Sequence, residues 1–244
     1  MVSQCDVIAL SYNRLSCTKE FIRSFFSCTK VPSHLYLIDN ASTDGTQEFL
    51  KTVGAVPPHT ISVICNNENL GFVDGMNQGI ALTSAPYVCL ANNDLIFTKG
   101  WLTEIISIFD TYDTVGIINP HSNNFGRYPP KGVSIHEYAK DLNRQFGGTF
   151  VEMPHCIGFC MVIRREVIEK VGGLSAEFSP FFFEDADYVM KAKEAGYLVG
   201  LAKGAYVWHH EHASVDKLGK EKERQFKKSK RLFEKKWGKP LRIA

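Results

Sequence analysis

Short polar clusters follow five apolar runs of this 244-residue sequence. Each run has the length of a buried β-strand, and each cluster begins where its run ends. In open α/β sheets, ligands bind outside the carboxyl ends of the strands, so we expect the clusters to meet at one polar rim. The clusters are Ser11-Tyr12-Asn13-Arg14, Asp39-Asn40, Asn66-Asn67, Asn92-Asn93-Asp94 and His209-His210.

One such cluster alone would indicate little, because Asn, Asp and Ser also favour turns and helix caps. Five together, with an acidic residue and a histidine among them, predict a ligand site. A further acidic group, Glu184, Asp185 and Asp187, opens a predicted helix, and carboxylates there also complement the positive end of the helix dipole. The preceding Phe181-Phe182-Phe183 is either an aromatic wall of a site or plain core.

Apolar runs that alternate with amphipathic stretches predict an α/β fold with a mostly parallel sheet flanked by helices. The segment from His121 to Gly148, with weak periodicity and Pro129 and Pro130, is expected to be a long loop. Predicted strands are Asp6–Ser11, Leu35–Asp39, Thr60–Asn66, Tyr87–Ala91, Val115–Asn119, Cys160–Arg164 and Ala205–His209. Predicted helices are Thr18–Ser27, Thr43–Thr52, Val73–Thr83, Trp101–Tyr112, Arg165–Val171, Asp185–Ala195 and Lys217–Trp237.

The composition, 44% hydrophobic and 22% charged, is that of an ordinary globular protein. No apolar run approaches the roughly 20 residues that a transmembrane helix needs. The first residues lack the basic start of a signal peptide. Seven cysteines without CxxC spacing favour a reducing compartment, and we expect a cytoplasmic protein.

The charge is unevenly distributed along the chain. Residues 217–244 hold nine lysines and three arginines against three glutamates, a balance of +9, so the remainder of the +2 chain carries −7. Phe226, Phe233 and Trp237 share one face of the predicted helix over this segment. Either that face packs on the body and the lysines are merely solvated, or the lysines contact anionic lipid at the inner face of a membrane.

Eight motifs in order resemble the family 2 glycosyltransferases of the GT-A fold, especially the rhamnosyltransferase-like branch. The resemblance runs from Asp6 to about Lys239. It implies a Rossmann-like catalytic domain over residues 1–216, followed by a basic C-terminal helix or tail over residues 217–244. The motifs are VIALSYNR, LIDNASTDGT, NLGFVDGMNQGI, LANNDLIF, GFCMVIRREVIEKVGGL, FFFEDADYVMKAKEAGY, VWHHEHAS and FEKKWG.

The resemblance implies inverting transfer of a sugar from a nucleoside diphosphate sugar to a hydroxyl of a glycan or a lipid-linked acceptor, as in polysaccharide biosynthesis. It makes Asp94 and His209 the ligands of Mn²⁺ or Mg²⁺, since carboxylate suits both ions and Mn²⁺ tolerates imidazole. The acidic motif departs from the family at Asn92 and Asn93, which leaves one carboxylate and predicts weaker metal affinity.

The resemblance also implies the remaining roles. Asp185 is the general base of the Glu184-Asp185 pair, worth about 10²–10⁴-fold in rate. Asp39 is expected to accept the imide N–H of uracil or thymine, which favours UDP- or dTDP-linked donors. Arg14 is either a donor contact or a solvated turn residue. Donor contacts are expected at Ser11, Tyr12, Asn13, Arg14, Asp39, Asn69, Gly71, Asn92 and Asn93, and acceptor contacts at Gly158, Phe159 and Phe183.

Three other functions fit the residues less well. A nucleic-acid-binding protein would use the basic tail, but the acidic body would repel phosphates, so no nucleic-acid partner is expected. A nucleotidyltransferase would need a glycine-rich phosphate loop, and LSYNRLSCTKE has no glycine. A zinc hydrolase built on His209, His210, Glu211 and His212 would lack HExxH spacing.

Overall fold

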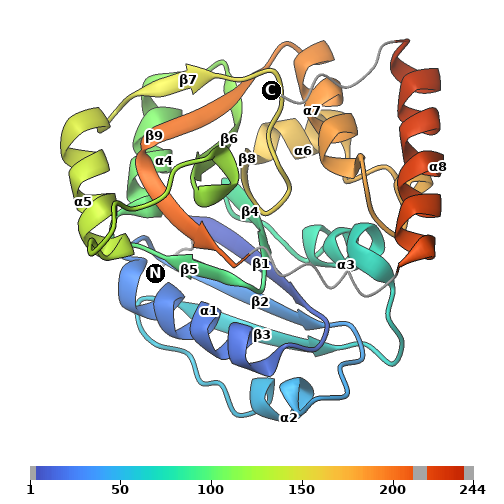
Figure 1. Ribbon diagram of the computed structural model, residues 1–244, viewed down its shortest axis with the longest axis horizontal. Coiled ribbons are helices and arrows are strands. Elements are labelled where there is room, and N and C mark those ends of the chain that lie inside the picture. Colours follow the sequence, from blue (N-terminus) through green and yellow to red (C-terminus); the bar gives the residue numbers. More distant parts are fainter. Residues whose placement is uncertain (1–3, 211–218, 239–244) are drawn as a thin grey trace.

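A nine-stranded mixed sheet forms the centre of the computed structural model, which describes residues 4–210 and 219–238 (Figure 1). The strand order is β3-β2-β1-β4-β8-β6-β9-β5, and β7 pairs with β9. The strands are β1 (Cys5–Ser11), β2 (Ser33–Asp39), β3 (Thr60–Cys65), β4 (Tyr87–Asn92), β5 (Leu95–Phe97), β6 (Val115–His121), β7 (Phe150–Glu152), β8 (Cys160–Arg164) and β9 (Leu198–His209).

Strands β1, β2, β3, β4, β6 and β9 run in one direction, because β8 is antiparallel to both β4 and β6. Their carboxyl ends therefore share one edge of the sheet. The chain moves outward from β1 to β3 and then returns to place β4 on the other side of β1. This reversal opens a crevice between β1 and β4, where open α/β sheets bind their ligands.

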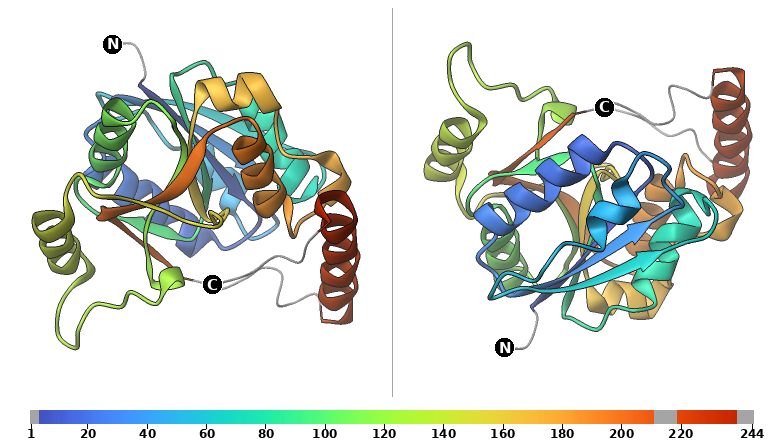
Figure 2. Two further views of the ribbon diagram at one scale, coloured as in Figure 1. Left: turned by 90° about the horizontal axis from the view of Figure 1, so that it is seen from above. Right: turned by 90° about the horizontal axis from the view of Figure 1, so that it is seen from below.

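Both faces of the sheet are buried beneath helices (Figures 1 and 2). Val7 and Ala9 of β1 pack with α1 and α4 on one face, whereas Ile8 packs with α3 and α7 on the other. Parallel strands buried on both faces read as continuous apolar runs, which explains why the sequence revealed them. The helices are α1 (Leu15–Cys28), α2 (Thr46–Leu50), α3 (Gly71–Ile80), α4 (Trp101–Thr111), α5 (Ile135–Phe146), α6 (Arg165–Val171), α7 (Glu184–Glu194) and α8 (Lys220–Trp237), with 3₁₀ turns η1 (Asn123–Phe125) and η2 (Ala176–Phe178).

The predicted α/β fold with a mostly parallel sheet and a C-terminal helix is confirmed, but the predicted loop from His121 to Gly148 is wrong in part. It contains α5, which starts at a capping box formed by Ser134 and Glu137. Its apolar residues Ile135, Tyr138, Ala139, Leu142 and Phe146 have the spacing of an amphipathic helix and pack together against Tyr206, so the sequence carried a helical signal that the prediction overlooked.

The structure also adds elements at the far side of the sheet. Strand β9 begins seven residues before the predicted Ala205, at Leu198, and the short strands β5 and β7 pair with it. The predicted tail extends beyond the described residues at 217–218 and 239–244. Among the described helices, none combines the length and apolar character that crossing a membrane requires.

Candidate functional site

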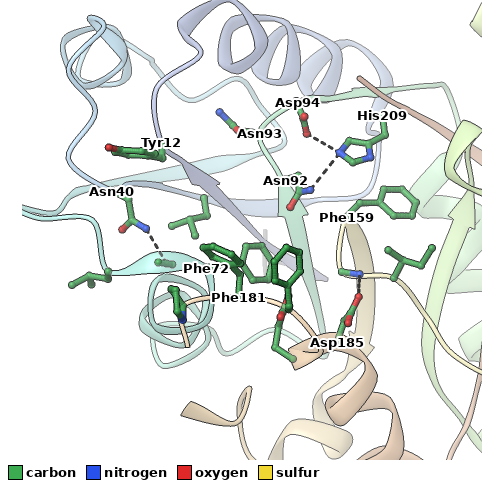
Figure 3. A pocket seen from close by; sticks show the side chains of 18 of the residues that line it. Tyr12, Asn40, Phe72, Asn92, Asn93, Asp94, Phe159, Phe181, Asp185 and His209 are labelled. Atoms are coloured by element: carbon green, nitrogen blue, oxygen red, sulfur yellow. Dashed lines mark hydrogen bonds and ion pairs between the residues drawn. The ribbon is translucent and has the colours of Figure 1, made fainter. Parts of the chain in front are cut away.

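A cavity of about 650 Å³ opens at the carboxyl edge of the sheet, between β1, β4, α3 and α7 (Figure 3). Its volume is typical of small-molecule sites. One wall is polar and the other is apolar. The lining residues are Leu10, Tyr12, Asn40, Asn69, Leu70, Gly71, Phe72, Asn92, Asn93, Asp94, Asn124, Ile157, Gly158, Phe159, Pro180, Phe181, Phe182, Glu184, Asp185 and His209.

Asp94 and His209 meet on the polar wall although 115 residues separate them in the chain. Antiparallel pairing of β5 with β9 places His209 opposite Leu95, directly beside Asp94. Their side chains approach to 3.0 Å between Asp94 Oδ1 and His209 Nε2, at 9% and 11% exposure. The backbone N–H of His210 donates to the Asp94 carbonyl at 3.0 Å, which fixes the two strand ends together.

The imidazole of His209 is held in one orientation by residues that follow β6. Its Nδ1 lies 2.8 Å from Oδ1 of Asn124, and we assign the proton to this nitrogen, which then donates to the amide oxygen. Asn123 binds the backbone of His209 on both sides, at 2.9 Å from its N–H and 2.7 Å from its carbonyl. The ring also stacks on Phe159, with centroids 5.4 Å apart.

This tautomer leaves the lone pair of Nε2 facing the carboxylate of Asp94. The Nδ2 group of Asn92 lies 3.4 Å from the same nitrogen, as expected if Nε2 accepts. Asp94 Oδ1 is buried without a hydrogen-bond partner in the described part of the chain. Two acceptors that face each other away from water are unfavourable unless a cation joins them.

The residues fit a divalent metal ion. Two ligands held about 2.1 Å from one ion at a right angle lie about 3.0 Å apart, which matches the separation seen between Asp94 and His209. Within residues 4–210 and 219–238, no group of three or more His, Cys, Asp or Glu side chains could hold a metal. Asp94 and His209 would therefore supply part of the coordination, and water or a bound phosphate the rest. His210 instead binds Glu20 at 2.9 Å, so it does not extend this pair.

Across the cavity from Asp94 and His209, Asp185 lies in the first turn of helix α7 (Figure 3). Glu184, the first residue of α7, also lines the cavity. Oδ2 of Asp185 accepts the backbone N–H of Gly158 at 3.0 Å, and its Oδ1 accepts that of Ala186 at 2.7 Å. Glu184 is 8% exposed, and its Oε2 has no hydrogen-bond partner among the residues described.

The two carboxyl groups differ in their tendency to ionise because their environments differ. Burial, and secondarily the charge of Asp185, raises the pKa of Glu184 to about 8. Burial also raises the pKa of Asp185, but the backbone N–H groups of Gly158 and Ala186 and the nearby His155 oppose this rise. We therefore assign the negative charge of the pair near pH 7 to Asp185 and the proton to Glu184.

A strained turn places the aromatic residues before α7. Phe182 and Phe183 have φ of 77° and 69°, in the left-handed region that side chains other than glycine rarely adopt. Helix α3 contacts this turn through a hydrogen bond, in which the Phe72 N–H donates to the Pro180 carbonyl at 2.8 Å. A Cβ on Gly71 would lie 2.6 Å from Cβ of Pro180, so this glycine permits the close approach of the turn.

The structure divides the predicted donor-binding residues into two groups. Tyr12, Asn69, Gly71, Asn92 and Asn93 line the cavity. Ser11, Asn13, Arg14 and Asp39 do not line it.

Asn13 ties two loops together, because its side chain accepts the Thr43 N–H at 2.8 Å. Ser11 and Asp39 are fully buried neighbours on β1 and β2, and within the described residues Ser11 Oγ and Asp39 Oδ1 lack hydrogen-bond partners. Both atoms lie at the carboxyl ends of their strands, where neither is exposed.

On the predicted acceptor side, Gly158 and Phe159 line the cavity but Phe183 does not. Phe183 is 8% exposed and packs against Phe226 and Phe233 of α8, because its left-handed backbone turns the ring away from the cavity. Phe181 and Phe182 line the cavity instead.

Sequence analysis missed Asn124, which orients His209. The signal was present, since Asn123 and Asn124 follow a strand whose carboxyl end lies on the same edge as the other clusters. The predicted strand stopped at Asn119, two residues before the end of β6 at His121, and this placed both asparagines in a presumed loop.

Comparison with known proteins identifies related sequences. The family model described as Glycosyl transferase family 2 matches residues 6–172. An N-acetylglucosaminyl-diphospho-decaprenol L-rhamnosyltransferase of Mycobacterium tuberculosis is 22% identical over 88% of this chain and 78% of its own. The chain spans 22%, 34% and 52% of the length of three other curated relatives, among them a cellulose synthase catalytic subunit of Komagataeibacter sucrofermentans.

Solved structures share the fold. The mannosyltransferase PcManGT from Pyrobaculum calidifontis, in complex with GDP-Man and Mn²⁺, has a TM-score of 0.65 at 16% identity, over 88% of this chain and 60% of that one. TarS 1–349 of S. aureus in complex with UDP-GlcNAc has a TM-score of 0.64 at 16% identity, over 86% and 59% of the two chains. These similarities confirm the GT-A architecture predicted from the sequence motifs.

Replacing Asn124 should weaken metal binding through His209. In Asn124→Ala the imidazole loses its Nδ1 partner, so we expect the dissociation constant for Mn²⁺, measured by EPR with UDP present, to rise about 10–100-fold. Asn124→Asp keeps an oxygen acceptor and should retain most of the affinity. Asn67→Ala, at an exposed site, is the control. Equal Mn²⁺ affinity in Asn124→Ala and wild type would contradict the role of Asn124.

The free energy of unfolding of Glu184→Gln, relative to that of the wild type, should increase as the pH rises. Because the folded protein keeps a proton on Glu184 up to about pH 8, while the unfolded chain releases it near the ordinary glutamate pKa of 4.5, the free energy of unfolding of the wild type falls across this range. The glutamine of the variant does not titrate, so the free energy of unfolding of the variant does not fall for this reason. Denaturant unfolding at several pH values measures the difference, with exposed Glu169→Gln as control. A difference that does not change with pH would show that Glu184 is charged in the folded state.

Proposed function

The chain belongs to glycosyl transferase family 2, and on that premise we propose that it transfers a sugar from a nucleoside diphosphate sugar to an acceptor hydroxyl, with inversion at the anomeric carbon. The observation that carries this proposal is the placement of two separate chemical groups in one cavity. A cation-binding pair, Asp94 and His209, lies on one side, and a carboxylate, Asp185, lies on the other. This is the division that displacement of a diphosphate by a hydroxyl requires.

Asp185 would act as the general base. As the acceptor oxygen bonds to the anomeric carbon, its proton passes to the Asp185 carboxylate, and the bond from that carbon to the phosphate oxygen breaks. Attack from the side opposite the diphosphate inverts the configuration in a single step. The Gly158 N–H, which donates to Oδ2 at 3.0 Å, keeps the carboxylate turned towards the cavity. Neutral Glu184 would avoid a second negative charge beside the base.

Asp94 and His209 would hold Mn²⁺ or Mg²⁺, which would neutralise the charge that develops on the departing diphosphate. The imidazole ligand favours Mn²⁺, because Mg²⁺ prefers oxygen ligands. With Asn92 and Asn93 in place of carboxylates, the protein supplies little negative charge, and the diphosphate itself would complete the site. We therefore expect metal and nucleotide to bind together rather than separately.

For the donor, we propose a uridine or thymidine diphosphate sugar. Tyr12, 41% exposed at the edge of the cavity, offers a ring against which a base can stack. Asp39 Oδ1 and Ser11 Oγ, buried and unpartnered among the described atoms, would bind the imide edge of the base. The acceptor would be a glycan or a lipid-linked saccharide of polysaccharide biosynthesis, bound near Gly158 and Phe159, and residues 1–216 would form the catalytic domain.

A cytoplasmic setting is supported by the cysteines. All seven lie within the described residues and none forms a disulfide. A reducing compartment keeps cysteines in this state.

A screen for slow hydrolysis of nucleotide sugars tests the activity without knowledge of the acceptor. We expect UDP- or dTDP-sugars to be hydrolysed in the presence of Mn²⁺, and GDP-sugars much more slowly. Excess EDTA, Asp94→Ala and His209→Ala should each lower the rate by about 10²-fold or more. Full hydrolysis in EDTA would rule out the metal, and a preference for GDP-sugars would overturn the role of Asp39.

The Asp185→Asn substitution distinguishes between two roles of Asp185, that of a general base and that of a helix cap. Asparagine has the same shape and also caps helices, so the free energy of unfolding should change by less than about 1 kcal/mol. Nucleotide affinity should stay within a few-fold of wild type, while transfer falls about 10²-fold or more because an amide cannot accept the proton. Near-normal transfer, or a retained anomeric configuration in the product, would remove Asp185 from the reaction.

A further inference from the structure

Helix α8 carries a continuous basic face. The basic residues at i, i+4, i+7, i+11 and i+15 from Lys220 fall on one side of an α-helix, and Lys228 lies beside them. All six side chains are exposed and together line a shallow depression on the surface. We call this set the basic face; it consists of Lys220, Arg224, Lys227, Lys228, Arg231 and Lys235.

The opposite side of α8 is fixed to the protein, so the basic face has a set direction. Phe233 is 1% exposed and packs in the core with Phe183. Gln225 lies 3.3 Å from the Ser179 carbonyl and 3.4 Å from that of Phe181. These contacts show that the aromatic face packs on the body, and they leave the lysines on the other side of the helix to face solvent or a partner.

The end of α8 is anchored by a buried charge. Asp187 of α7 is fully buried and binds Lys236 Nζ at 2.8 Å and Trp237 Nε1 at 2.9 Å. Lys236 also contacts Glu177, at 2.6 Å. Lys236 therefore points inward, whereas the lysines of the basic face do not take part in this anchor.

The basic face stands out electrostatically from the rest of the molecule. Helix α8 contains seven lysines and two arginines against three glutamates, a net charge of +6, so the rest of the +2 chain carries −4. Arg224 and Lys227 contact Glu221 and Glu223, but at 3.8 Å and on exposed side chains, which is a weak form of pairing. The positive potential is thus confined to one edge of the protein, where Figures 1 and 2 place α8.

An exposed aromatic side chain connects this helix to the cavity. Phe226 is 40% exposed, and its ring lies 5.4 Å from that of Phe182, which lines the cavity. Phe182 in turn contacts Phe181, another lining residue, at 4.9 Å. A row of aromatic rings therefore leads from the cavity to the packed side of α8, opposite the basic face.

We propose that the basic face of α8 docks on the headgroups of an anionic lipid bilayer and so holds the cavity, which lies on the packed side of α8, near the membrane surface. Clusters of four to eight lysines and arginines on an amphipathic helix are typical of sites that bind anionic lipid, and the basic face has six. The face extends about 23 Å along the helix axis, from Lys220 to Lys235, which suits a flat surface. A nucleic acid could contact only this edge, because the rest of the protein carries a net negative charge that repels phosphates. The docking itself stands on α8; only its purpose, access to a lipid-linked acceptor, rests on the proposed function.

Flotation with lipid vesicles tests the docking. The full chain should float with vesicles of phosphatidylcholine mixed with phosphatidylglycerol, should not float with phosphatidylcholine alone, and should be released by salt. The triple variant Arg224→Gln, Lys227→Gln, Arg231→Gln should bind the mixed vesicles at least about 10-fold more weakly. The matched control is Lys30→Gln, Lys99→Gln, Lys140→Gln, which removes the same charge from exposed sites outside α8 and should bind as wild type does.

The outcomes separate docking from catalysis. Donor hydrolysis should be equal in the two triple variants, because none of the six side chains lines the cavity. Equal vesicle binding by both variants, equal binding to neutral vesicles, or tighter binding to double-stranded DNA than to anionic vesicles would overturn the docking proposal. Vesicle binding without hydrolysis of any nucleotide sugar would leave docking intact and count against the proposed function instead.

Discussion

Two buried acceptors, Asp94 Oδ1 and His209 Nε2, face each other at 3.0 Å, and much of the site is arranged around them. Among residues 4–210 and 219–238, no group satisfies both atoms, so a cation is the natural occupant. The fold makes this contact by ending β4 and β9 at the same edge of the sheet and pairing β5 with β9. Asn124 and Phe159 then hold the imidazole so that its lone pair points at the carboxylate.

The proposed general base, Asp185, depends on burial in a different way. Glu184 and Asp185 are adjacent at the start of α7, yet backbone N–H groups bind both oxygens of Asp185, whereas Oε2 of Glu184 has no hydrogen-bond partner among the described residues. The same helix end therefore supports one carboxylate and one neutral acid. The strained turn at Phe182 and Phe183 sets where α7 begins, and α3 and α8 hold that turn from two sides. Helix α8 therefore helps to position the proposed base, Asp185, and it also forms one edge of the molecule.

The sequence predicted the sheet well because parallel strands buried on both faces leave unbroken apolar runs, as in β1 and β4. It also predicted which strand ends carry polar groups, and Asn92, Asp94 and His209 do line one cavity. It failed where three-dimensional context decides. Helix α5 was missed although Ile135, Tyr138, Ala139 and Leu142 have helical spacing, because the prolines before it indicated a loop over the whole segment. The direction of the Phe183 ring depends on a left-handed backbone, which the residue type does not reveal. Asn124 was missed because the end of β6 was placed too early.

The cation-binding role of Asp94 and His209 is the central claim, and anomalous diffraction from a crystal grown with UDP and Mn²⁺ tests it most directly. The account predicts a manganese peak within about 2.2 Å of both Asp94 Oδ1 and His209 Nε2, in contact with the diphosphate. A peak that touches the diphosphate but neither side chain, or a UDP complex in which His209 Nε2 donates a hydrogen bond to Asp94 with no metal between them, would contradict it.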